Sequence, residues 1–177
     1  MAADLEAEAG SDTALPLIEQ LRVYQPAEAD TALATLRLRQ SRIGEAADAL
    51  QSALACYRVD PWPLVRYKQK ALTLATTISG TDPATAPRLY DALREPFSVH
   101  AVDNARRIAQ LEVAAKFDFK GRCIEPIAGL EPHVPWTARF LAMRRDCYQL
   151  NNDPRVVVAN RDLNDFMAGE PLPIAPR

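Results

Sequence analysis

The sequence predicts an all-α protein made of antiparallel helical hairpins stacked as a short α-solenoid. Two observations support this fold class. Alanine and leucine contribute 30 and 20 of the 177 residues, glycine contributes 6, and aromatic and β-branched types are few, a mixture that favours helix over sheet. Nearly all of the 14 prolines stand between segments of helical periodicity, so they separate helices and do not interrupt them.

In the first half of the chain, apolar residues recur at three- and four-residue spacing, which gathers them on one face of a helix. The segment after Ile43 has a wide, alanine-rich apolar face that neighbouring helices can approach closely. Asp60 with the prolines that follow it is typical of a helix start, and Gly80 of a helix end. The expected helices cover residues 17–24, 27–41, 43–57, 61–80 and 82–93.

The second half continues the pattern. Residues 98–118 divide into an apolar side and a polar side, so we expect one buried face and place the polar side chains in water. The polar side consists of Asp103, Asn104, Arg106, Arg107 and Gln110. Shorter helices are expected over 121–130 and 136–150. The run Val156–Val158 would suit a strand, but the preceding Asp153-Pro154 pair and the later spacing favour a helix.

The two ends differ from the rest. Residues 1–14 hold four acidic residues and no lysine or arginine, and we expect a disordered acidic tail there. Residues 170–177 contain three prolines and no helical pattern, which predicts a second disordered tail. The helical repeat domain is then residues 15–169.

Charge and hydropathy exclude some classes of function. A formal charge of -2 argues against a nucleic-acid binder, since phosphate affinity is largely a sum of lysine and arginine contacts. The apolar runs are too short to span a membrane. Cys56, Cys123 and Cys147 lack the spacing of a metal knuckle, so we expect three reduced structural thiols, no metal and a cytoplasmic location.

No catalytic motif is present. The sequence has no glycine-rich phosphate loop, no G-x-S-x-G turn and no H-E-x-x-H helix. His100 opens a helix and His133 lies in a proline-rich turn, which are positions typical of surface residues. We therefore expect neither enzymatic activity nor a cofactor.

The hairpins show an internal pattern. Ala46, Leu50 and Ala53 precede Pro61, and later Cys147, Ala159 and Leu163 precede Pro171. These offsets resemble the tetratricopeptide repeat (TPR), in which small residues let paired helices touch. The resemblance covers about residues 27–60 and 136–171, and Pro61 lies three residues later than the repeat expects. It implies a protein-interaction module with a concave binding surface.

A second resemblance gives a different function. The order DPWP, EPF and EPHVPW is similar to helical C-terminal extensions of some bacterial spermidine-synthase-like membrane fusion proteins. This resemblance implies an accessory or regulatory helical domain of an enzyme whose catalytic part lies outside this chain.

The candidate binding surface follows from the TPR resemblance. Arginine outnumbers lysine by 17 to 4, and paired guanidinium groups hold carboxylates well, so a protein or peptide with acidic character is the expected partner. The alternative is that these arginines pair locally with Asp and Glu. Trp62 and Trp136 are expected to pack between hairpins, and an exposed end of the stack could pair with a second copy. The expected partner-binding residues are Thr31, Thr35, Arg39, Arg139 and Met143.

Overall fold

The computed structural model describes residues 2–169, and every regular element within that range is a helix. The all-α prediction is confirmed. The chain divides into two compact units, the first ending at Asp118 and the second beginning at Phe119. We expected one domain over 15–169. Two apolar clusters lie in the first unit, and neither contains a residue beyond Phe117. The second predicted tail, residues 170–177, lies outside the described residues.

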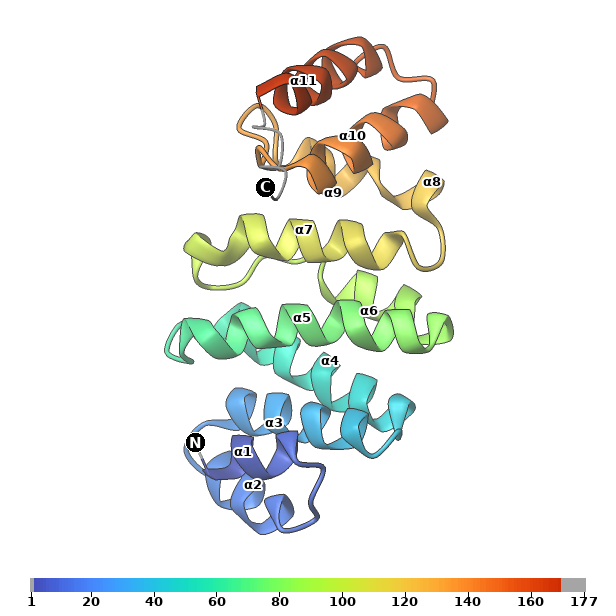
Figure 1. Ribbon diagram of the computed structural model, residues 1–177. Helices are drawn as coiled ribbons and strands as arrows, with labels where there is room; N and C mark the ends of the chain where they lie inside the picture. The colour runs from blue at the N-terminus through green and yellow to red at the C-terminus, as the bar shows by residue number, and fades with distance from the viewer. Residues whose placement is uncertain (1, 170–177) are drawn as a thin grey trace, which may run out of the picture. The chain divides into compact units, whose positions relative to one another are not determined.

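The first unit consists of seven α-helices and two short 3-10 turns among its described residues (Figure 1). The expected helix over 98–118 is shorter in the structure, because a 3-10 turn at His100–Val102 replaces its first residues. The α-helices are α1 (Ala2–Glu8), α2 (Ala14–Arg22), α3 (Pro26–Arg39), α4 (Ile43–Val59), α5 (Val65–Thr81), α6 (Ala86–Ala92) and α7 (Asp103–Ala114).

The helices of the first unit pack in sequence order. A three-residue connection with Ser41 in the left-handed region joins α3 to α4, and these two helices form the most extensive pair. In turn, α1 contacts α3, α3 contacts α5, and α5 contacts α7, while α4 packs against both α5 and α6. Alanines at the contacts let the helix backbones approach closely, and larger side chains fill the spaces between them. The largest fully buried apolar ones include Leu50, Leu54, Tyr57, Ile78, Leu89 and Tyr90.

Three of the five residues on the polar side of α7 are buried, which corrects the expectation that this side faces water, whereas Asn104 is exposed and Arg107 is partly exposed. Arg106 is 1% exposed, and Asp103 and Gln110 are buried beside it. Arg106 donates to the Oδ1 of Asp103 at 2.8 Å and to the carbonyls of Leu93 and Arg94. These carbonyls follow α6, so the guanidinium ties the connection between α6 and α7 to α7 itself.

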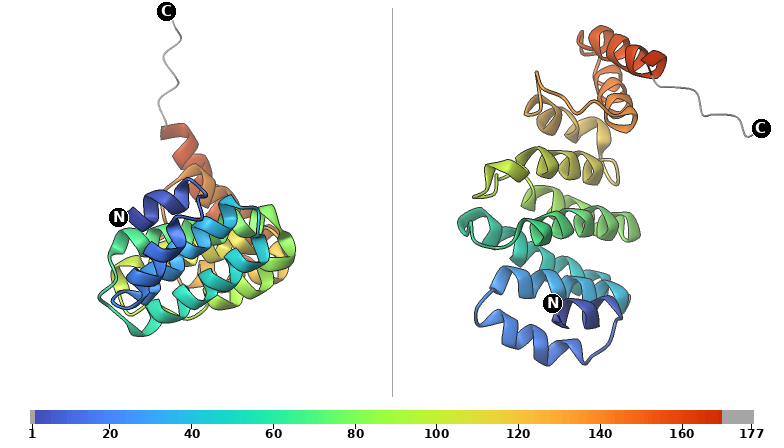
Figure 2. Two further views of the ribbon diagram at one scale, coloured as in Figure 1. Left: turned by 90° about the horizontal axis from the view of Figure 1, so that it is seen from below. Right: turned by 60° about the vertical axis from the view of Figure 1, so that its left-hand side comes forward.

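Residues 2–13 form α1 and the turn that leads to α2, contrary to the disordered tail that we expected over residues 1–14. Helix α1 lies alongside α3 (Figure 2), and its Ala3 and Ala7 are buried against the cluster that includes Ile18 and Leu36. Composition alone suggested disorder because the segment is acidic and contains few large apolar residues. Its carboxylates, however, meet cations of other helices.

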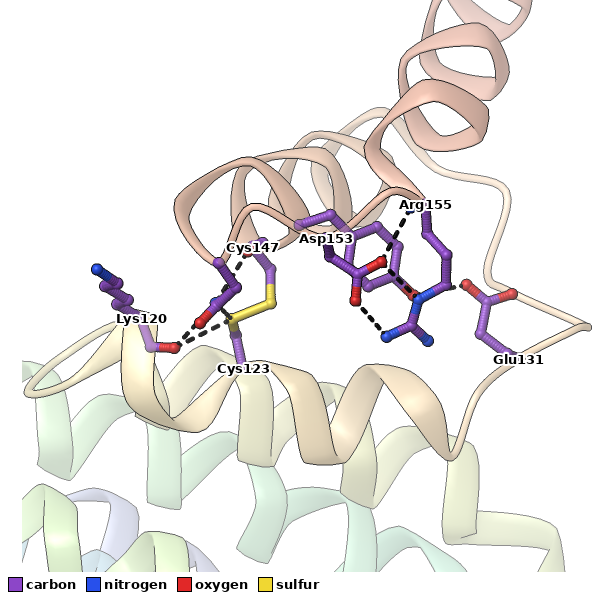
Figure 3. The surroundings of a disulfide bond; sticks show 8 residues. Lys120, Cys123, Glu131, Cys147, Asp153 and Arg155 are labelled. Carbon is purple, nitrogen blue, oxygen red and sulfur yellow. Dashed lines mark hydrogen bonds and ion pairs between the residues drawn. A yellow bond between two sulfur atoms is a disulfide. The ribbon is translucent and has the colours of Figure 1, made fainter.

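A disulfide links two segments of the second unit. Its helices are α8 (Phe119–Arg122), α9 (Ile124–Ala128), α10 (Ala138–Leu150) and α11 (Val156–Gly169). A disulfide joins Cys123, before α9, to Cys147 in α10 (Figure 3). The expectation of three reduced thiols is therefore wrong for these two residues, and only Cys56 is a free thiol. The run Val156–Val158 is helical, as the capping signal before it indicated.

Buried charge also organises the second unit. Arg144 is 4% exposed and donates to the carboxylates of Glu131 and Asp162, each at 2.7 Å. Glu131 accepts a further hydrogen bond from the hydroxyl of Tyr148. Arg155 holds Asp153 in the turn before α11, and these hydrogen bonds lower the pKa of Asp153 to about 2 (Figure 3).

Within residues 2–169, no helix has the length and apolarity that crossing a bilayer requires.

Candidate functional site

The candidate site is a hollow of about 220 Å³ in the first unit, which we call the α3–α5 hollow. Its lining comes mainly from α3 and α5, with one residue from α1. Two cations, one carboxylate and a row of threonines give it polar walls, and two leucines form an apolar part. The lining residues are Glu8, Thr35, Leu38, Arg39, Lys70, Thr73, Leu74 and Thr77.

Two cations converge on a single carboxylate in this hollow. The Nζ of Lys70 lies 2.7 Å from the Oε1 of Glu8, and a guanidinium nitrogen of Arg39 donates to the Oε2 at 2.9 Å. Lys70 also donates to the Oδ1 of Asp4 at 2.6 Å. Arg39 and Lys70 are 31 positions apart in the sequence, and the packing of α3 against α5 brings them together. The cations of the hollow are therefore paired with carboxylates of α1.

The threonines give this face a fixed polar surface. The hydroxyls of Thr35 and Thr77 donate to carbonyls one turn earlier in their own helices, at 3.0 and 2.9 Å. That of Thr73 donates to Gln69 in the same way. Each hydroxyl oxygen keeps acceptor capacity while its own donor is satisfied. The threonine row therefore adds polar surface with no charge of its own.

The ion pairs in the hollow depend on pH. Hydrogen bonds from Lys70 and Arg39 lower the pKa of Glu8 below its ordinary value of 4.5. Burial acts to lower the pKa of Lys70, but hydrogen bonds to Asp4 and Glu8 outweigh this effect and raise it above 10.5. A lowered carboxyl pKa contributes stability above the unfolded-state value, and a raised lysine pKa contributes it below the unfolded-state value. The docking of α1 is thus strongest between about pH 5 and pH 10.

We accordingly expect α1 to loosen as the pH falls through the lowered pKa of Glu8. Hydrogen-exchange protection factors of the Ala9, Gly10 and Ser11 amides, which donate to α1 carbonyls, should decrease between pH 6 and pH 3, because protonated Glu8 no longer forms its ion pairs with Lys70 and Arg39. The Glu8→Gln variant serves as the control, because it has no carboxyl at this position to titrate. A decrease of the same size in that variant would contradict the assignment to Glu8.

The structure separates the predicted binding residues. Thr35 and Arg39 line the hollow, but Thr35 is only 2% exposed, so of the two Arg39 offers the accessible surface. Thr31 is fully buried, and its hydroxyl donates to the Ala27 carbonyl at 2.8 Å and lies 2.7 Å from the Tyr57 hydroxyl. Since the side chain has no exposed surface, it cannot contact a partner, and we do not retain Thr31 in the site.

Arg139 and Met143 belong to the second unit. Both lie on α10, where Arg139 is exposed and Met143 is half-buried. Neither lines the α3–α5 hollow. A single surface that combines them with Arg39 stays a prediction.

Sequence reasoning missed Lys70, Thr73 and Thr77. The signal was present, because these residues stand at three- and four-residue spacing on one face of the helix that contains them. They were missed because the excess of arginine over lysine drew attention to arginine alone. Several arginines pair locally: Arg106 and Arg107 both bind Asp103, and Arg144 binds Glu131 and Asp162. The local-pairing alternative therefore describes these arginines.

Trp62 is a second surface feature, and its expected packing role is wrong. Its side chain is 87% exposed in the connection between α4 and α5, close to Tyr24, which is 83% exposed. The two rings line a hollow of about 130 Å³ with Pro26, Asp60 and other residues. Trp136, in the second unit, is about half exposed and meets Phe166 edge to face.

The side chains of the described residues form no cluster of three or more His, Cys, Asp or Glu suited to a metal ion. His100 and His133 are both exposed. In comparisons with known proteins, the chain matches no protein-family model, no curated protein and no solved structure.

Proposed function

We propose that the first unit is a protein-interaction module that binds an acidic segment of a partner protein in the α3–α5 hollow. The observation that carries the proposal is the convergence of Arg39 and Lys70, from two helices, on the two oxygens of one carboxylate. A position between two cationic side chains favours a carboxylate over a neutral group, because hydrogen bonds between charged partners are stronger. The proposed activity is binding without a chemical step.

The order of helix contacts supports a TPR-like reading of this unit. Helices α1, α3, α5 and α7 contact one another in succession, and α4 packs against α6. In TPR-like stacks, the first helices of successive hairpins line the binding surface. The α3–α5 hollow is lined by residues of α1, α3 and α5, which are such first helices here. A short α-solenoid with a concave binding face is therefore the architecture that we propose.

The disulfide bears on where the module works. The cytoplasmic expectation depended on three reduced thiols, and two of them are paired. Disulfides persist mainly in oxidising compartments. The proposal for the first unit does not depend on the compartment, because neither cation nor threonine of the hollow responds to redox conditions.

The test of this function measures binding of a defined acidic peptide to the full chain. The probe is a labelled 14-residue peptide, AADLEAEAADLEAE, and its neutral counterpart is AANLQAQAANLQAQ. Both are titrated into the chain carrying Asp4→Asn and Glu8→Gln, which leaves Arg39 and Lys70 without their carboxylates. Fluorescence anisotropy at low ionic strength gives the dissociation constants.

We expect the acidic peptide to bind more tightly than the neutral one. Adding Arg39→Gln or Lys70→Gln should weaken binding about fivefold each, since one partly exposed ion pair contributes up to about 1 kcal/mol. Arg42→Gln is the matched control, because Arg42 pairs with Glu45 and does not line the hollow. Equal loss in the Arg42 variant would indicate nonspecific charge attraction and would contradict the proposal.

A further inference from the structure

Helix α1 is held in place by very little apolar surface. It has seven residues, which is too short for a stable isolated helix in water. Its buried side chains are Ala3 and Ala7, whereas Leu5, its largest apolar residue, is 72% exposed. Burial of two alanines contributes little compared with burial of leucine or phenylalanine. Contacts other than apolar ones must therefore account for much of its docking.

Charge supplies these contacts. Asp4 and Glu8 are four positions apart, so they lie on the same face of α1. Both reach Lys70 of α5, and Glu8 also reaches Arg39 of α3. The helix thus places alanines toward α3 and carboxylates toward the cations of the α3–α5 hollow.

The turn after α1 packs against the end of α3, beside the α3–α5 hollow. Gly10 has a φ of +74°, and a Cβ there would lie 3.3 Å from the Cβ of Arg39. The side chain of Gln40, at the end of α3, donates to the Gly10 carbonyl and to Asp12. The chain therefore returns close to the hollow, and α1 remains near it even when its ion pairs break.

An external acidic segment meets cations that are already occupied. To form the same ion pairs it must displace α1 or share its partners. A tethered segment competes at an effective concentration of about millimolar, which a weak free ligand does not match. A successful partner must therefore reproduce the contacts of α1 and add further ones along the threonine row of α5.

We propose that α1 is an intramolecular stand-in for the partner, and that the partner is an acidic amphipathic helix whose carboxylates recur every four residues beside a face of small residues. This inference rests on the proposed function and specifies it further. The partner helix displaces α1 from Arg39 and Lys70, so the chain limits its own binding. A helix longer than seven residues extends past the position of Glu8 and makes the additional contacts.

The experiment compares the wild-type chain with the Asp4→Asn/Glu8→Gln chain, using the peptide AADLEAEAADLEAE as the probe. We expect the peptide to bind the variant about fivefold more tightly, because the wild type must first break its own ion pairs. A variant with Glu6→Gln is the matched control. Glu6 accepts a hydrogen bond from Thr13 and pairs with neither cation of the hollow, so its loss should leave the affinity within about twofold of wild type.

A second measurement follows α1 directly. The amides of Ala9, Gly10 and Ser11 donate to carbonyls of Leu5, Ala7 and Glu6 at 3.1, 3.1 and 3.2 Å. When the peptide binds wild type, these amides should exchange faster, because α1 leaves its place. Circular dichroism before the titration establishes that each variant is folded.

Three outcomes separate the two proposals. Tighter binding by the variant together with faster exchange in wild type supports the inference. Equal affinities, or unchanged exchange at Ala9 to Ser11 on binding, overturn the displacement while the interaction function stands. No binding to either chain overturns the proposed function and this inference with it.

Discussion

Replacing Arg106 by leucine is expected to lower the free energy of unfolding of the first unit by about 3–5 kcal/mol, because the change leaves one oxygen of a buried carboxylate and two carbonyls without their donor. Arg106 is 1% exposed, and its guanidinium bridges Asp103 to the Leu93 and Arg94 carbonyls. Urea denaturation followed by circular dichroism measures the loss.

Two further variants show whether the geometry or the charge of Arg106 accounts for the expected loss of stability. Arg106→Lys keeps the charge but cannot form the fork that reaches Asp103 and both carbonyls, so we expect most of the loss to remain. Arg107→Leu removes the neighbouring, more exposed partner of Asp103 and should cost no more than about 1 kcal/mol. If the Arg106→Leu chain had a free energy of unfolding within about 1 kcal/mol of wild type, the loss would be no larger than that of one surface ion pair. That result would show that the buried network is not needed for stability.

The second large effect is expected in the second unit. Replacing both Cys123 and Cys147 by alanine should destabilise this unit by about 3 kcal/mol, because the disulfide closes a loop with a sequence separation of 24 residues and restricts the unfolded chain. Among the described residues of this unit, the two cysteines are buried together with Pro126, Ile127, Leu130, Phe140, Leu141, Tyr148 and Ala159.

Thiol titration of the denatured chain checks the pairing itself. Without reductant, one thiol should react, that of Cys56, and after reduction all three should react. In the folded chain, burial raises the pKa of Cys56, so its thiol should react slowly near neutral pH. Cys56→Ala is the matched control and should leave the stability of the second unit unchanged. Three reactive thiols without reductant would contradict the disulfide.

The local pattern predicted most helices because amphipathic spacing acts over a few residues, but the helix expected to start at Asp60 and Pro61 begins at Val65. The helix at Val156–Gly169 was assigned from the Asp153-Pro154 pair despite three β-branched residues in a row. The same reasoning failed for α7. Part of its polar face is covered as well as its apolar face, and the buried Arg106 donates to carbonyls from another segment.

The candidate site was predictable only in part. Arg39 and Thr35 came from the TPR resemblance and line the hollow. Lys70 was missed because its significance depends on Arg39 and Glu8, which are distant in the sequence. Thr31 was chosen from the same helix face as Thr35, but only packing against Tyr57 determines that it is buried.

By itself, the sequence determined the helical class, most helix positions and the breaks between them, because spacing, capping and proline act within one or two turns. Tertiary structure alone decided that the acidic first residues form α1 and dock on Arg39 and Lys70. It also decided that Cys123 pairs with Cys147 and that the chain divides after Asp118. Each of these depends on groups far apart in the sequence, whose proximity is set by packing and cannot be read from local pattern.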